Sequence, residues 1–243
     1  MDQVSEALRE MAGRFAELAS KASTPEREVT GTPGWSIVDV LGHVSCVPSR
    51  YRELALGRGA NPHVADARPS RTGPETGDEL IATVTEFGDE PRTMMFDGGQ
   101  RIRAGRARGT LLGEFVVHGY DIARTLGQPW PITAAHVPMI MDGLTQVIPG
   151  WVNAMRSGGH TATYEYRLRG FKRYVFRFDS GTLTVDPAET GPIDVCLSIE
   201  PVTALLLNYG RIGPVRPALS GQVLAWGRKP WLAPGFSRRF LPA

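Results

Sequence analysis

The chain has 243 residues and a formal net charge of +2, with 42% hydrophobic and 21% charged residues. These values allow a sizeable core in one large domain or two small ones, and they do not indicate a nucleic-acid binder. No apolar run approaches the roughly 20 residues that cross a membrane, and the N-terminus lacks the basic start and apolar core of a signal peptide. We therefore expect a cytoplasmic protein, monomeric or homodimeric, with neither nucleic acid nor membrane among its partners.

The chain is predicted to begin with two helices. Apolar residues recur at helical spacing over residues 3–22, which indicates an amphipathic helix. Ser36 opens the second helix, where Asp39 can complete a capping box. Trp35, just before it, can pack onto Val40 as a hydrophobic staple.

Pro48 should end or kink this second helix, because proline cannot donate the backbone hydrogen bond. After it come a loop rich in Gly, Pro, Arg and Asp, a weak helix, an ambiguous stretch and two clear helices. Gly127 is placed to cap the first clear helix. The loop covers residues 57–77, the weak helix 78–87, the ambiguous stretch 91–107, and the two clear helices 109–126 and 133–148.

The pattern changes after about residue 160. Residues 162–168 alternate apolar and polar side chains in the manner of a half-buried strand, and residues 179–181 read as a turn. Three more strands are expected over residues 173–178, 182–185 and 193–199. Two amphipathic helices are expected after them, over residues 200–209 and 221–228. The sequence thus predicts an α+β protein, in which a four-helix module (1–152) precedes a small α+β module (153–243).

A candidate metal site stands out in the clearest helix. Glu114 and His118 are four residues apart and Asp121 follows three later, so all three share one helix face inside an apolar arc. His43 lies within a similar arc on the second helix. Two helices that each bury an imidazole can bring both to one divalent metal, and two His with one carboxylate leave open positions for catalysis.

A simpler interpretation also accounts for these residues. A buried Glu114–His118 pair can satisfy itself by hydrogen bonding, and His43 can be an ordinary core histidine. Asp121 can equally be a surface or helix-terminal carboxylate. The spacing alone does not decide between this interpretation and a metal site.

Other residues give weaker signals. Arg50 and Tyr51 lie near His43 on the helical wheel and could reach a substrate carboxylate, although packing with a solvated head is the commoner role. Cys46 is expected to be a small buried hydrophobe, and both it and Cys196 a free thiol. The remaining histidines, expected to be exposed, are His63, His136 and His160.

Two strings carry a resemblance to a known family. Residues 35–43 (WSIVDVLGH) and 114–123 (EFVVHGYDIA), followed by Arg124 and Gly127, resemble the signature of the mycothiol-dependent maleylpyruvate isomerase family. That family belongs to the DinB-like metalloenzyme superfamily, and the resemblance covers roughly residues 1–150. It implies a DinB-like four-helix bundle in this part of the chain.

The resemblance also implies a chemistry. It assigns a divalent ion, usually zinc, to His43, Glu114 and His118, and makes Asp121 a residue that orients a ligand imidazole. The open metal positions would take water or the thiol of a small cofactor, with mycothiol expected. A zinc-stabilised thiolate could isomerise an activated alkene such as maleylpyruvate, or transfer sulfur to an electrophilic substrate.

The C-terminal part is similar, more weakly, to the small α+β domain of sterol-carrier type. The supporting strings are residues 201–207 (PVTALLL) and 219–223 (LSGQV). Two alternatives to the isomerase therefore stay open. One is a thiol transferase without isomerase activity, and the other is a non-catalytic protein that binds a small molecule or a lipid.

Overall fold

The structure is a computed structural model that describes residues 3–55, 93–96, 99–186, 188–189 and 191–241. It separates into two compact units: a helical unit, Met1–Ile132 with Met139–Leu144, and a sheet unit, Thr133–Pro138 with Thr145–Ala243. The predicted loop over 57–77, the weak helix over 78–87 and His63 lie outside the described residues.

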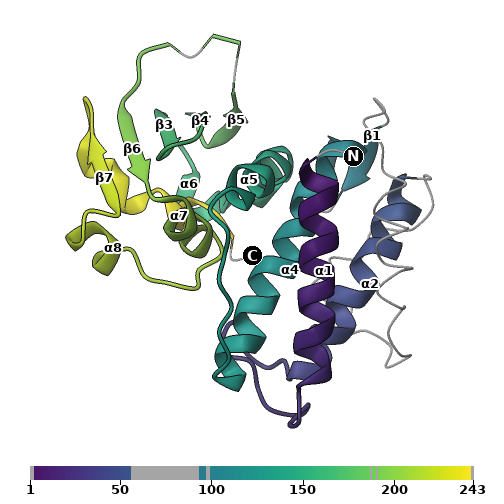
Figure 1. Ribbon diagram of the computed structural model, residues 1–243. Coiled ribbons are helices and arrows are strands. Elements are labelled where there is room, and N and C mark those ends of the chain that lie inside the picture. Colours follow the sequence, from purple (N-terminus) through teal and green to yellow (C-terminus); the bar gives the residue numbers. More distant parts are fainter. Residues whose placement is uncertain (1–2, 56–92, 97–98, 187, 190, 242–243) are drawn as a thin grey trace. The chain divides into compact units, whose positions relative to one another are not determined.

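The helical unit is built around one long helix. Both α1 and α2 pack against α4 (Figure 1), and Phe15 of α1 meets Phe115 of α4 edge to face, with 5.7 Å between ring centroids. A two-stranded antiparallel hairpin, β1 with β2, occupies part of the stretch that was ambiguous in sequence. The elements of this unit are α1 Gln3–Ser20, α2 Ile37–Ala55, β1 Thr93–Phe96, β2 Gln100–Arg103, α4 Ala104–Leu126 and part of α5 His136–Val147.

The local signals at helix ends mostly behave as predicted. Asp39 Oδ2 accepts from the Ser36 backbone N–H at 2.9 Å, and Ser36 Oγ accepts from the Asp39 N–H at 3.3 Å, so the capping box is confirmed. Gly127 caps α4 in the left-handed conformation, with φ 69°. Pro48 does not end α2, which continues to Ala55.

Two helices of this unit approach closely at a pair of glycines. A Cβ added at Gly109 of α4 would lie within 3.2 Å of the Met139 carbonyl, and one at Gly143 of α5 within 3.0 Å of three α4 backbone atoms. Only glycine leaves room for backbones this close. The pair therefore sets how α5 crosses the helix that carries Glu114 and His118.

The sheet unit contains one five-stranded sheet of order β5-β4-β3-β6-β7, in which only the β3–β6 pair is parallel. Its core is aromatic: Phe236 packs against Tyr164, Tyr166 and Phe176 from the buried face. The strands are β3 Ala162–Leu168, β4 Arg173–Asp179, β5 Thr182–Val185, β6 Val195–Ile199 and β7 Val223–Trp226. The helices are η3 Ile148–Trp151, α6 Ala154–Ser157, α7 Pro201–Asn208, α8 Val215–Leu219, η4 Pro230–Gly235 and η5 Ser237–Arg239.

The predicted helix over 221–228 is wrong. Residues Val223–Trp226 form edge strand β7, antiparallel to β6 with Val223 opposite Ile199. Four successive apolar residues carry no periodicity that separates helix from strand. Pairing with the free edge of β6 makes this segment a strand. The nearby short helix α8 was not among the predicted elements.

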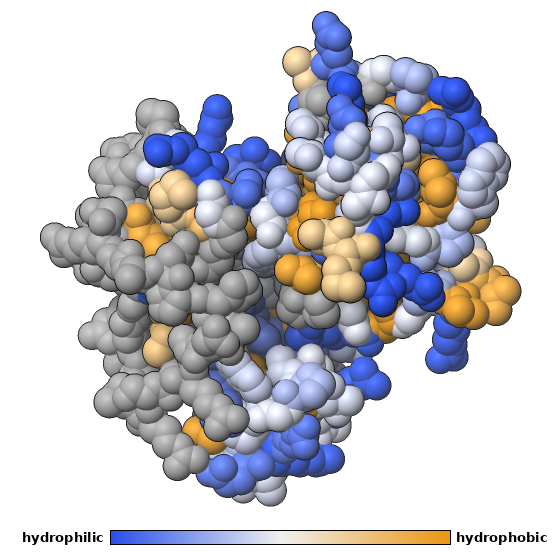
Figure 2. Space-filling view, turned by 180° about the vertical axis from the view of Figure 1, so that it is seen from behind, coloured by the Kyte–Doolittle hydropathy of each residue, from blue (hydrophilic) through white to orange (hydrophobic). Residues whose placement is uncertain are grey.

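Several exposure predictions are also corrected. Cys46 is exposed rather than buried, His136 is buried, and His160 is half-buried beside Tyr164. Apolar side chains are scattered among hydrophilic ones over the visible surface (Figure 2). Among the large side chains, Trp226 and Trp231 are 42% and 70% exposed.

The α+β class predicted from sequence is confirmed, with helices in the N-terminal part and a sheet in the C-terminal part. Within the described residues, no helix combines the length and apolar character needed to cross a membrane.

Candidate metal centre

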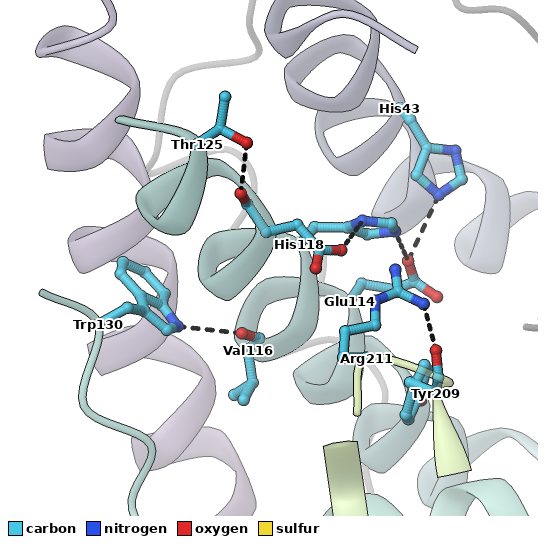
Figure 3. A network of polar contacts seen from close by, with 9 residues as sticks. His43, Glu114, Val116, His118, Thr125, Trp130, Tyr209 and Arg211 are labelled. Atoms are coloured by element: carbon cyan, nitrogen blue, oxygen red, sulfur yellow. Dashed lines mark hydrogen bonds and ion pairs between the residues drawn. The ribbon is translucent and has the colours of Figure 1, made fainter. Parts of the chain in front are cut away.

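Two helices bring three of the predicted residues together. Glu114 and His118 come from successive turns of α4, and His43 comes from α2 (Figure 3). Glu114 Oε2 lies 3.3 Å from His43 Nε2 and 3.2 Å from His118 Nε2. The two imidazole rings stand nearly perpendicular, with centroids 5.3 Å apart. Both imidazoles therefore converge on a single carboxylate oxygen.

The three side chains lie in a largely closed environment. Those of His43, His118 and Glu114 are 9%, 14% and 22% exposed. The ring of Trp35 meets the His43 ring edge to face, with 5.2 Å between centroids. Glu114 keeps the greatest exposure of the three.

Charge in the metal-free cluster is set by the carboxylates. Burial alone would raise the pKa of Glu114, but hydrogen bonds from His118 and His43 outweigh burial and hold the pKa of this carboxyl well below its ordinary value. Burial likewise opposes the imidazolium of His118, yet the Asp121 and Glu114 carboxylates outweigh it and raise the pKa of His118 to about 9. At neutral pH and without metal, His118 is therefore protonated.

Asp121 lies behind His118, away from Glu114. Its carboxylate is only 2% exposed, and its Oδ2 is 3.7 Å from His118 Nδ1. That distance allows an ion pair but exceeds a hydrogen bond, and among the described residues the buried Nδ1 atom has no hydrogen-bond partner. The alternative that Asp121 is a surface carboxylate is excluded, since it is buried against the ring that it was predicted to orient.

The helix around His118 is held by an aromatic residue that the sequence did not single out. Trp130 donates its Nε1–H to the Val116 carbonyl at 3.0 Å (Figure 3). A Cβ at Gly119 would lie within 2.7 Å of three carbons of the Trp130 ring, so this position has room only for glycine. The guanidinium of Arg14 covers the same ring, 4.6 Å from its centroid.

The remaining predicted residues are not part of the cluster of three. Arg50 and Tyr51 lie seven and eight residues beyond His43 on α2, about 10–12 Å further along the helix axis. Tyr51 is buried and packs edge to face against Phe96 of β1, with 5.2 Å between centroids. Roles for Arg50 and Tyr51 in binding a substrate stay predictions.

The donor set fits a divalent metal. One nitrogen from each imidazole and one oxygen of Glu114 all lie within 4.8 Å of one another. Two ligands of one tetrahedral zinc, each at ~2.0–2.2 Å, lie about 3.3–3.6 Å apart, close to the 3.3 and 3.2 Å observed between nitrogen and oxygen. Nδ1 of His118 faces Asp121, as in metal sites where a carboxylate orients a ligand imidazole.

Comparison with known proteins gives the fold. No family model matches the chain, and no curated protein matches it in sequence. The solved structures similar to it include the mycothiol-dependent maleylpyruvate isomerase and a mutant of that enzyme. The first is 14% identical with a TM-score of 0.52, over 91% of this chain and 90% of the isomerase. The mutant is 13% identical with a TM-score of 0.53, over 92% of this chain and 91% of that one.

A third structure, described as the ubiquinone synthesis protein UbiJ-SCP2, covers 42% of this chain with 14% identity and a TM-score of 0.33. A TM-score at that level does not establish a shared fold, so the sterol-carrier-like interpretation of the sheet unit stays a prediction. The two isomerase structures do establish a fold shared over about nine-tenths of the chain.

Proposed function

We propose that the protein is a metal-dependent enzyme that uses a low-molecular-weight thiol, mycothiol in the first instance, against a small electrophilic substrate. His43, Glu114 and His118 would hold the ion, which we take to be zinc because two imidazoles and one carboxylate suit it. The observation that carries the proposal is the convergence of both imidazole Nε2 atoms on Glu114 Oε2, at 3.3 and 3.2 Å. The fold shared with a mycothiol-dependent isomerase supports it.

Zinc bound here would stabilise a thiolate over a thiol, and so make a nucleophile at neutral pH. The protein's own residues prepare the site. Glu114 stays ionised despite burial and supplies the negative charge that two neutral imidazoles lack. Asp121 faces His118 Nδ1 and would keep a proton there, which leaves Nε2 free as a ligand.

Two reaction types follow from a thiol nucleophile. Addition of the sulfur to an activated alkene, rotation about the resulting single bond and loss of the same sulfur would isomerise the alkene. Displacement of a leaving group by the sulfur would instead give a thioether. The isomerase with the similar fold favours the first type, with maleylpyruvate as the first substrate to test.

The deciding experiment measures metal by mass spectrometry on purified wild-type, Glu114→Gln and His118→Ala proteins. We expect about one zinc per chain in the wild type and loss of metal in both variants. The matched control is His160→Gln, which changes a half-buried histidine outside the cluster and should keep the metal. Maleylpyruvate isomerisation is then followed with mycothiol and with glutathione.

Metal-free wild-type protein would contradict the proposal. It would favour a non-catalytic protein that binds a small molecule or lipid, and analysis of co-purified apolar compounds would be the next step. Stoichiometric metal with no isomerase activity would direct the work to thiol transfer.

A further inference from the structure

The loop before α2 is closed on itself by its own backbone. We call residues 29–35 the clamp loop. The Val29 N–H donates to the Trp35 carbonyl at 2.9 Å, the Thr32 N–H to Val29 at 3.1 Å and the Trp35 N–H to Thr32 at 3.0 Å. Outside the loop, Glu28 and Ser36 form an isolated antiparallel bridge. Because hydrogen bonds join its two ends, we expect the clamp loop to keep one conformation.

One side of the clamp loop touches Asp121. A Cβ added at Gly31 would lie within 2.6 Å of both carboxylate oxygens of Asp121. Gly31 does not have a positive φ, so glycine is needed here for space and not for an unusual backbone conformation. Any larger residue would have to turn the buried Asp121 carboxylate away or push the loop outward.

The last residue of the clamp loop touches the other half of the cluster. Trp35 lies edge to face against His43, with an interplanar angle of 79°. The capping box at Ser36 and Asp39 fixes where α2 begins, so Trp35 and His43 sit on one rigid connection. The clamp loop thus contacts a residue of α2 directly and, through Asp121, faces His118 on α4.

We propose that the clamp loop is the positioning device of the metal centre: Gly31 packs against Asp121 and so fixes the His118 ring, while Trp35 fixes the His43 ring. The proposal builds on the proposed metal site but concerns residues that do not bind the ion. It assigns Gly31 and Trp35 a role in the affinity and geometry of the site. The three atoms nearest to a Cβ added at Gly31 all belong to Asp121.

The test compares Gly31→Ala, Asp121→Ala and the double variant with wild type. Zinc affinity is measured by competition with a chromophoric chelator, and the coordination geometry by the visible spectrum of the cobalt-substituted protein. Changes in residues that support metal ligands typically weaken affinity about 10–100-fold, and we expect Gly31→Ala to fall in that range with an altered cobalt spectrum. In the Asp121→Ala background all three clashing atoms are gone, so Gly31→Ala should add little further loss.

Matched controls separate positioning from general destabilisation. Gly13→Ala places a methyl group where no atom lies within 4 Å, and it should leave the affinity and the spectrum unchanged. Trp35→Phe keeps an aromatic edge near His43, whereas Trp35→Leu removes it. We expect the leucine variant to lose more metal affinity than the phenylalanine variant.

A second readout does not need metal. In the metal-free protein, ¹H–¹⁵N correlation spectra of the imidazole rings at one fixed pH report which nitrogen carries the proton. Gly31→Ala should change the His118 ring signals and Gly13→Ala should not. If wild-type protein binds no metal, the proposed function fails, and the clamp is still judged by these spectra. Unchanged His118 signals, or additive losses in the double variant, would overturn the clamp.

Discussion

At the scale of single residues, His118 is the most tightly constrained group of the site. Its Nε2 faces Glu114 at 3.2 Å, and its Nδ1 faces Asp121 at 3.7 Å. Each carboxylate favours the imidazolium, and together they outweigh the cost of burying it. The ring is thus held between two acidic groups, and a metal ion would have to displace the proton on Nε2.

This charge arrangement predicts how the metal-free protein responds to pH. The pKa of His118 is raised from 6.5 to about 9 in the folded state, so the folded protein binds this proton more tightly than the unfolded chain. Its stabilisation is fully present below pH 6.5 and is lost as pH rises through about 9. With metal removed by chelator, we expect the free energy of unfolding in urea to fall by roughly 1–3 kcal/mol between pH 6 and pH 9.5.

The control for this pH effect is His118→Ala, which should lose most of the decline in that window. His160 cannot cause the decline, because burial and the neighbouring Arg239 and Lys229 lower its pKa from 6.5 to about 4. The unfolded chain binds this proton more tightly, so the His160 contribution to stability increases as pH rises through 6.5. An equal decline in the alanine variant would show that His118 is not the group responsible.

At the scale of elements, α4 organises the helical unit and the site together. Its middle carries Glu114, its C-terminal half carries His118 and Asp121, and its first two turns carry Gly109, where α5 crosses. The same helix therefore contributes two of the three candidate metal ligands and the close approach to α5. We therefore expect substitutions at these positions of α4 to reduce either metal binding or stability.

The close crossing gives a stability prediction. In Gly143→Ala the new methyl group would lie within 3.0 Å of the Thr110 nitrogen, the Gly109 carbonyl carbon and the Arg106 oxygen, all backbone atoms that cannot rotate away. Overpacking of this kind costs about 1–3 kcal/mol, although alanine has the higher helix propensity. Urea unfolding should show the loss, and Gly13→Ala, with open space around it, should show none or a small gain.

At the scale of the whole molecule, a metal that binds only the folded chain adds to its stability. The donors come from two helices far apart in sequence, so the unfolded chain cannot present them together. Binding then stabilises the folded state by RT ln(1 + [L]/Kd), or about 2.7 kcal/mol at a free metal concentration 100 times Kd.

Calorimetry of the whole chain tests this coupling. Zinc should raise the melting temperature in a concentration-dependent way, and a chelator should reverse the rise. Glu114→Gln removes the carboxylate on which both imidazoles converge and should abolish the response to zinc. A zinc response of the same size in this variant would place the bound metal elsewhere in the chain.

Much of this protein was determined by local sequence. The four-residue spacing of Glu114 and His118 places them on one helix face whatever packs around them, because the α-helix repeats every 3.6 residues. The capping box at Ser36 needs only residues within one turn. Strand β3 has the predicted bounds Ala162–Leu168, but it is not half-buried as predicted, because its polar residues Thr163 and Glu165 are buried as well. These features depend on neighbours a few residues apart.

Only the tertiary structure decided the rest. Several contacts of the site join segments whose local sequence patterns carry no information about each other. They are the contacts of His43 with Glu114, of Gly31 with Asp121 and of Trp130 with Gly119. Residues Val223–Trp226 likewise form a strand because they pair with the edge of β6. The four apolar residues of this segment do not by themselves indicate that pairing. Helical and strand periodicities specify which face a side chain occupies, whereas the partner of that face is chosen by the packing of the whole chain.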